Sequence, residues 1–285
     1  MNDAAGPGQE TGAAPPGAMA PSTATGQPTP REPAAVGDAL REAMAFVSAA
    51  TEAGITVRLL GGMAVRILCP DYPPRPVTGL QDIDLATVTP ARKALQTFLI
   101  DQGHQPDKTF NALYGHKQLY FTSAVSGWPI DVLVDRLVMC HELDFRDRIT
   151  NMPCTLDVVD MLLSKLQIIR LNEKDAQDII YLLSAHPVRH EAAPGSISLE
   201  AFRAIVANDW GWWRTATMNL EKIQALIRQE TDRRVPANAQ HDPAAQASTL
   251  ITAANEVPKS KRWKLRARIG DRVRWYQEPD ESTHH

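Results

Sequence analysis

The chain of 285 residues contains only three cysteines, Cys69, Cys140 and Cys154, and they lie far apart. They form no C-x-x-C pair, so the sequence predicts neither a disulfide framework nor a zinc knuckle. The sequence also lacks a run of about 18 apolar residues and the charged-then-apolar start of a secretory signal. These absences argue against membrane-spanning and disulfide-rich secreted proteins, and they predict a cytoplasmic protein without a membrane partner.

Acidic and basic residues are unevenly distributed. Residues 259–276 hold eight basic residues and one acid, a charge of +7, which leaves −10 for the rest of a chain whose net charge is −3. Trp263, Trp275 and Tyr276 stand among these basic residues. Phosphate contacts together with aromatic stacking would suit RNA. A solvated tail, or one that folds back onto the acidic remainder, is equally consistent with this pattern.

Hydrophobic periodicity predicts an α+β protein, with a small mixed β-sheet and flanking helices in residues 37–150 and a helical bundle in residues 151–230. Residues 1–36 are rich in Pro, Ala and Gly and predict a disordered arm. Residues 231–258 predict a linker, and residues 259–285 form the basic tail. Strands are predicted at 57–60, 82–85, 118–122 and 130–135. Helices are predicted at 38–53, 63–68, 91–102, 155–171, 175–184, 199–210 and 215–229, with helical character beginning directly after Asp135 and Thr155 as an N-cap.

Asp82 and Asp84 stand one residue apart between apolar neighbours, in the segment LQDIDL of residues 80–85. Side chains at positions i and i+2 of a strand point to the same face, so both carboxylates would project together. Adjacent carboxylates repel each other, and a divalent cation between them relieves that repulsion. Mg²⁺ prefers oxygen ligands and often binds substrate phosphates as well. The pair therefore predicts metal-assisted phosphate chemistry.

Asp131 lies in a second alternating strand, IDVLVD at residues 130–135. If that strand is a neighbour of the first, three carboxylates could hold two Mg²⁺ or Mn²⁺ ions, which suits an in-line displacement at phosphorus. The predicted metal ligands are therefore Asp82, Asp84 and Asp131. Alone, each could be an ordinary turn or strand-end acid.

A glycine pair, Gly61-Gly62, follows a short apolar strand about twenty positions before these aspartates. Strand, Gly-Gly turn, helix, Asp-x-Asp strand and later Asp strand together resemble the nucleotidyltransferases of the DNA polymerase β superfamily. In that family the glycine turn lies against the triphosphate and the acids bind the metal ions. Glycine lets backbone N–H groups approach phosphate because it has no Cβ.

A Pro-rich insert containing Arg75 and Thr78 makes the chain similar to the AbiEii-type group, the toxins of type IV toxin–antitoxin systems. Downstream, Lys165-Leu166 followed by Lys174-Asp175 and Asp178 resembles the helical motif of that group. The resemblance implies that Asp82, Asp84, Asp131, Lys165 and Asp175 are catalytic. It also implies nucleotide binding by five residues, Gly61, Gly62, Arg75, Thr78 and Lys165.

The implied activity is a metal-dependent transfer of a nucleoside monophosphate from an NTP, ATP among them, to a hydroxyl of tRNA, other RNA or protein. A toxin role with an antitoxin partner is implied as well. Two alternatives remain open. One is a nucleotidyltransferase acting on a small molecule such as an antibiotic, and the other is a catalytically silent scaffold that binds nucleic acid or a partner.

Overall fold

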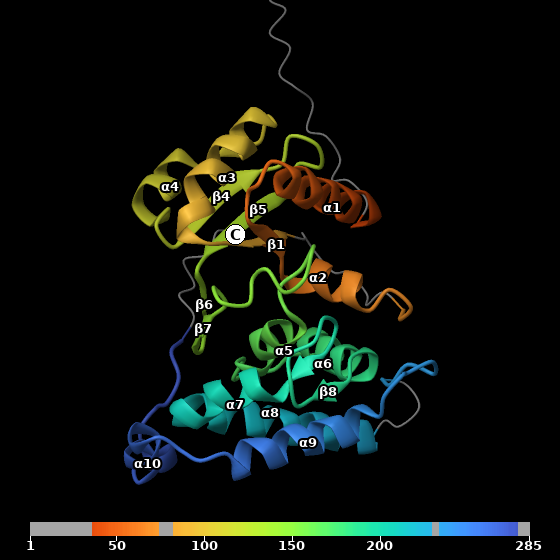
Figure 1. Cartoon of the computed structure of the whole chain (residues 1–285), viewed down its shortest axis with the longest axis vertical. Coiled ribbons are helices and arrows are strands. Elements are labelled where there is room, and N and C mark those ends of the chain that lie inside the picture. The colour runs from red at the N-terminus through yellow and green to blue at the C-terminus, as the bar shows by residue number, and fades with distance from the viewer. Residues whose placement is uncertain (1–35, 74–81, 230–233, 279–285) are drawn as a thin grey trace, which may run out of the picture. The chain divides into compact units, whose positions relative to one another are not determined.

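In the computed structural model, residues 36–73, 82–229 and 234–278 are described (Figure 1). The α+β arrangement predicted from the sequence is confirmed: a small mixed sheet with flanking helices precedes a group of helices. In these residues no helix is both long enough and apolar enough to cross a membrane. The predicted arm of residues 1–36 lies outside the described residues except for Val36, and so do Arg75 and Thr78.

Five strands form the main sheet in the order β1-β2-β5-β4-β3. The central pair, β2 and β5, is parallel, and the other neighbours are antiparallel. The bounds are β1 Val57–Leu59, β2 Ile83–Thr87, β3 Gln105–Pro106, β4 Gln118–Thr122 and β5 Pro129–Val134. The helices within this part are α1 Val36–Glu52, α2 Gly61–Leu68, α3 Thr89–Asp101 and α4 Lys108–Tyr114.

Alternation along β4 and β5 gives this part of the sheet one buried apolar face and one more exposed, more polar face. In β5, Ile130, Val132 and Val134 are buried, whereas Asp131 and Leu133 between them are half-buried. Side chains directly opposite each other on neighbouring strands point to the same face. Because Asp84 is the partner of Asp131 in the parallel pair, the two aspartates lie side by side on the polar face.

The segment after β5 forms a hairpin, so the helix predicted from the sequence after Asp135 is wrong. Strands β6 Arg136–Val138 and β7 Glu142–Asp144 pair antiparallel. Asp135 between β5 and β6 has a positive φ of 66°, so the chain turns there instead of entering a helix. Its carboxylate accepts hydrogen bonds from the backbone N–H and the hydroxyl of Thr89.

The helical part begins at α5 Val158–Leu166, and its N-cap is Asp157 rather than the predicted Thr155. The carboxylate of Asp157 accepts a hydrogen bond from the backbone N–H of Val159, which satisfies one of the free donors of the first turn. The remaining elements are α6 Glu173–Ala185, β8 Val188–Arg189, β9 Ile197–Ser198, α7 Leu199–Asn208, α8 Trp210–Gln229, α9 Pro243–Glu256, α10 Lys261–Ala267 and the 3₁₀ turn η1 Gly270–Arg272.

Helix α9 corrects the predicted linker of residues 231–258. Its composition is rich in Ala and polar residues, but Ala247, Leu250, Ala253 and Ala254 are spaced to lie on one face and all are buried. Small side chains allow close approach of this helix to its neighbours, so a segment of low hydrophobicity still packs into the core.

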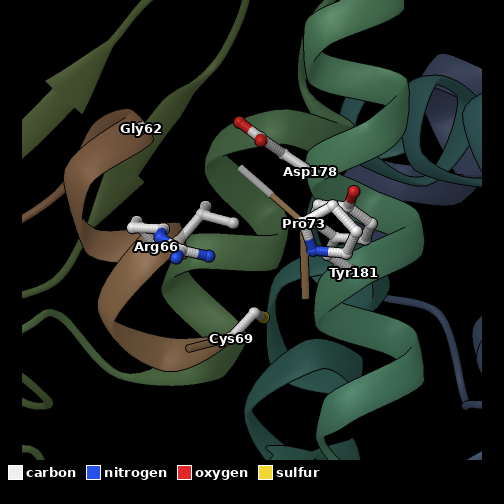
Figure 2. A pocket seen from close by; sticks show the side chains of 7 residues that line it. Gly62, Arg66, Cys69, Pro73, Asp178 and Tyr181 are labelled. Atoms are coloured by element: carbon white, nitrogen blue, oxygen red, sulfur yellow. The ribbon is translucent and has the colours of Figure 1, made fainter. Parts of the chain in front are cut away.

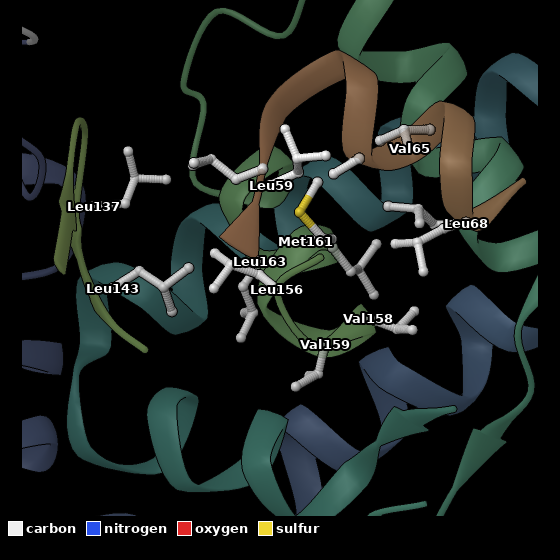
Figure 3. Packing of buried hydrophobic residues seen from close by; sticks show 14 of the residues in the cluster. Leu59, Val65, Leu68, Leu137, Leu143, Leu156, Val158, Val159, Met161 and Leu163 are labelled. Atoms are coloured by element: carbon white, nitrogen blue, oxygen red, sulfur yellow. The ribbon is translucent and has the colours of Figure 1, made fainter. Parts of the chain in front are cut away.

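One continuous core joins the sheet to the helices (Figure 3). Leu59 of β1, Val65 and Leu68 of α2, and Val158 and Met161 of α5 all belong to it. The backbone reinforces this joint, since the N–H of Leu59 donates to the carbonyl of Cys154 and the N–H of Leu156 donates to the carbonyl of Leu59. Residues 154–156 thus cover the free edge of β1 and bring α5 against α2.

Candidate functional site

Asp84 and Asp131 form the centre of the candidate site. They are register partners on β2 and β5, and both are half-buried. Gln118 Nε2 lies 2.8 Å from Oδ1 and 2.8 Å from Oδ2 of Asp131, so the amide donates to this carboxylate and fixes its orientation. Gln118 was not among the site residues predicted from the sequence. Its polar side chain at an outward position of the alternating strand 118–122 is a signal that could have identified it.

Tyr120 also belongs to this face, because it is the partner of Asp131 across the β4–β5 pair. Burial raises the pKa of the Tyr120 hydroxyl, and the nearby charges of Asp82, Asp131 and Asp107 raise it further. The charges of Asp82 and Asp131 thus both lie near this hydroxyl.

Asp82 itself stands just before β2 and is exposed. Partial loss of hydration raises the pKa of its carboxyl above the usual value. Among the described residues no group of three His, Cys, Asp or Glu side chains is placed to hold a metal ion. The structure therefore brings Asp84 and Asp131 together, while the role of Asp82 as a third ligand stays a prediction.

Gly61 lies directly against the carboxylate of Asp84. Its φ is +68°, and a Cβ added there would stand 1.9 Å from Asp84 Oδ2. The backbone N–H of Leu60 also donates to the carbonyl of Asp84, at 3.0 Å. Only glycine combines this backbone conformation with so close an approach. The glycine turn is thus fitted to the acidic pair.

Helix α2 begins at this turn, and no side chain caps its first turn within the described part of the chain. The first N–H groups of a helix lack partners inside the helix and attract anions. Gly61 and Gly62 therefore offer backbone donors beside two carboxylates, which is a suitable setting for a metal-bound phosphate.

Lys165, Asp175 and Asp178 form a second charged group, between α5 and α6. Lys165 Nζ lies 2.7 Å from Asp175 Oδ1 and 3.1 Å from Asp178 Oδ2. Burial lowers the pKa of the Lys165 ammonium, but the charges of Asp178 and Asp175 outweigh that effect, so its pKa is raised and it stays charged. One cation is thus held by two carboxylates in a largely buried place.

A small cavity connects this group to the glycine turn (Figure 2). Gly62 and Arg66 of α2 line one side, and Asp178 and Tyr181 of α6 line the other. Its volume of about 30 Å³ has room for roughly one water molecule. Gly61 lies against Asp84, and its neighbour Gly62 lines the same cavity as Asp178. The glycine turn at the start of α2 therefore lies between the two charged groups.

The comparisons with known proteins give no family for this chain. No family model matches it, and no curated protein matches it. Among solved structures, three neighbours are nucleotidyltransferase or nucleotidyltransferase-like proteins.

The antibiotic-resistance factor ANT(2'')-Ia has a TM-score of 0.35 at 9% identity, over 68% of this chain and 96% of its own. An antigenic nucleotidyltransferase-like protein from Paracoccidioides brasiliensis has a TM-score of 0.38 at 14% identity, over 80% of this chain and 97% of its own. A candidate nucleotidyltransferase from H. pylori has a TM-score of 0.29 at 12% identity, over 81% of this chain and 95% of its own. Likenesses this distant support no conclusion about the activity of this chain.

Proposed function

We propose that this protein is a metal-dependent nucleotidyltransferase that moves a nucleoside monophosphate from an NTP to a hydroxyl and releases pyrophosphate. The proposal rests on one observation above all: Asp84 and Asp131 are register partners on adjacent parallel strands, and Gly61 packs against the Asp84 carboxylate. Paired carboxylates beside uncapped backbone N–H groups suit a metal-bound phosphate.

The residues present fit Mg²⁺ or Mn²⁺ by the chemistry of their donors. Asp84 and Asp131 supply carboxylate oxygens from neighbouring strands, and the missing Cβ of Gly61 leaves room for the Asp84 carboxylate. Asp84 and Asp131 would hold the metal ion, with Asp82 as a further ligand. A bound divalent ion would neutralise the phosphate oxygens during displacement.

Other residues of the chain would position the nucleotide. The backbone N–H groups of Gly61 and Gly62 would donate to the triphosphate, as helix N-termini do toward anions. Asp175 and Asp178 hold the Lys165 ammonium in one place. We assign Lys165 to the triphosphate side of the site and Asp175 to orienting it, which is the role that their 2.7 Å contact supports. Catalysis would come from positioning and electrostatic stabilisation.

The acceptor in this proposal is a hydroxyl of RNA, tRNA included, or of a protein. A toxin role of the AbiEii type, with an antitoxin as partner, remains a proposal that rests on the order of the sequence motifs. The proposed nucleotide donor is an NTP, with ATP among the candidates.

A label-transfer assay tests the proposed activity. Each of the four NTPs, labelled at the α-phosphate, is incubated with the protein, Mg²⁺ or Mn²⁺, and total cellular RNA and protein. We expect metal-dependent label transfer that falls about 100-fold or more in the Asp84→Asn and Asp131→Asn variants. Asp101→Asn, at the exposed end of α3, is the matched control and should keep full activity. Absence of transfer with every NTP and acceptor class would refute the proposal.

A further inference from the structure

The basic segment of residues 259–276 is a folded part of the molecule rather than a solvated tail. The backbone N–H of Ser260 donates to the carbonyl of Ala207, and that of Gln277 donates to the carbonyl of Cys140. The rings of Trp263 and Trp213 stand 5.3 Å apart, edge to face. The segment is therefore fixed to α7 and α8 and to the β6–β7 hairpin.

Three of its eight basic residues are engaged in contacts within the protein. The Arg266 guanidinium lies 4.7 Å from the centre of the Trp210 ring, and the Lys259 ammonium lies 5.2 Å from that of Trp263. Arg274 forms an ion pair with Glu278 at 3.0 Å. The one acid of the segment, Asp271, is paired with Arg214 of α8, also at 3.0 Å. Such contacts are typical of an ordered surface.

The other five basic residues are free to bind something else. They are all exposed, and none forms an ion pair with any residue in the described ranges; they are Lys261, Arg262, Lys264, Arg268 and Arg272. These five cations sit within twelve residues on a scaffold that is already folded, so binding would not have to order the backbone first.

We propose that this surface binds the phosphate backbone of RNA without sequence preference and holds the acceptor strand for the transferase. The choice of RNA rests on the proposed function, whereas the clustering of unpaired cations does not. A polyanion is the partner whose charge complements five adjacent cations on an otherwise acidic protein.

The orientation of the aromatic rings decides the kind of contact. Trp263 and Trp275 pack edge to face against Trp213 and Trp210, and Lys259 and Arg214 stand over their rings at 5.2 Å and 5.7 Å, so both rings are already engaged within the protein. Base stacking, which would give the strongest single-strand binding, is therefore not expected here. Contact through phosphates alone predicts a steep dependence on salt and little dependence on sequence.

A lipid surface fits the same segment less well. Leu265 and Ile269 are 64% and 44% exposed, but Lys261 precedes Leu265 by four residues and shares its face of α10. Interfacial helices separate an apolar face from a basic face so that the apolar face can enter the membrane. Here the cations and the aliphatic side chains are intermixed, and the helix has only seven residues.

Fluorescence anisotropy with a labelled single-stranded RNA of mixed sequence, about 20 nucleotides long, tests the proposal on the full-length protein. We compare wild type with the Lys264→Gln, Arg268→Gln, Arg272→Gln triple variant. The matched control removes the same charges elsewhere, as Lys93→Gln, Arg189→Gln, Arg228→Gln, three exposed positions outside the segment. Binding is measured without NTP or metal ion, so it can succeed where the transfer assay fails, and the reverse.

We expect the segment variant to bind at least tenfold more weakly and the slope of log K against log salt to flatten by about 0.7 for each charge removed. The control variant should bind like wild type. Equal weakening in both triple variants would overturn the proposal, because it would mean that only overall charge matters. Binding to vesicles of phosphatidylserine in preference to RNA would overturn it as well.

Discussion

At the scale of single residues, Gly61 is the most constrained position of the candidate site. A Gly61→Ala substitution would place a Cβ 1.9 Å from Asp84 Oδ2 in a backbone with φ of +68°. Because the methyl group cannot coexist with the carboxylate where it stands, we expect loss of transferase activity by about 100-fold. The unfolding free energy should fall by only about 1–2 kcal/mol. Label transfer and urea unfolding measure the two effects.

Gly54→Ala is the control for that substitution. Gly54 has a similar φ of +75°, but nothing lies within 4 Å of its Cβ position. It should therefore lose a similar amount of stability while keeping activity. If both alanine variants retain full activity, the carboxylate of Asp84 is not held where the proposed chemistry needs it.

We expect Gln118 to affect how tightly Asp84 and Asp131 bind a metal ion. Its amide donates to both oxygens of Asp131, and partners of metal ligands set how firmly the metal is held. Gln118→Ala should weaken Mn²⁺ binding by about 10-fold or more, as measured by calorimetry on the protein without nucleotide. Gln102→Ala, at an exposed position, should leave binding unchanged. Unaltered affinity in Gln118→Ala would remove Gln118 from the site.

At the scale of elements, removing the cation from the ion group between α5 and α6 should destabilise that joint. The side chains of Lys165 and Asp175 are each 12% exposed, and that of Asp178 is 1% exposed. Lys165→Met would leave two buried carboxylates without their cation, so we expect a loss of about 3–5 kcal/mol in unfolding free energy. Asp175→Asn keeps the contact with Asp178 and should cost less. Similar small losses in both variants would contradict a buried ion group.

We expect the free energy of unfolding to depend on pH through His141, which lies where the β6–β7 hairpin, α8 and the C-terminal segment meet. Its Nε2 lies 2.8 Å from Thr215 Oγ1, the same oxygen to which the indole N–H of Trp275 donates. Burial lowers the pKa of His141 to about 4. The native state therefore binds fewer protons than the unfolded state between about pH 6.5 and pH 4, so His141 makes stability fall as the pH falls through that range.

The size of this effect follows from the shift in pKa. We expect His141 to account for about 3 kcal/mol of the stability lost between pH 7 and pH 4. His141→Gln removes the titrating group and should give a flatter profile over this range in urea unfolding followed by tryptophan fluorescence. Identical profiles for variant and wild type would show that His141 is not buried in a neutral form.

At the scale of the whole molecule, the sequence predicted the sheet better than the connections around it. Asp84 and Asp131 could each be expected to point away from the buried neighbours in their own strand, because strand periodicity fixes side-chain direction within a strand. Their register and parallel pairing could not be predicted, because these depend on contacts between distant segments. The β6–β7 hairpin was misread as helix since its strands have only three residues each, too few for a period to appear.

Residues that position other side chains, or that pack a segment into the core, could not be predicted from the sequence for the same reason: their contacts depend on distant segments. The buried alanines of α9 carried no strong apolar signal, so the helix was read as a linker. Gln118 touches Asp131 only because β4 and β5 pair. The contact of Lys165 with Asp175 could be expected from the motif order, but its burial between two carboxylates is a property of how α5 packs on α6.

The last prediction concerns what fixes the C-terminal segment to the rest. In the described residues this segment covers Trp210 and Trp213 and supplies the Trp275 partner of Thr215. A chain ended after Glu256 would expose those rings to water, so we expect the melting temperature to fall by several degrees. Hydrogen exchange should quicken in α7, α8 and the β6–β7 hairpin. The triple variant Lys264→Gln, Arg268→Gln, Arg272→Gln keeps every one of these contacts and should melt like wild type. If the shortened chain also melts like wild type, the segment does not pack as described, and its free cations would then have no fixed arrangement to present to RNA.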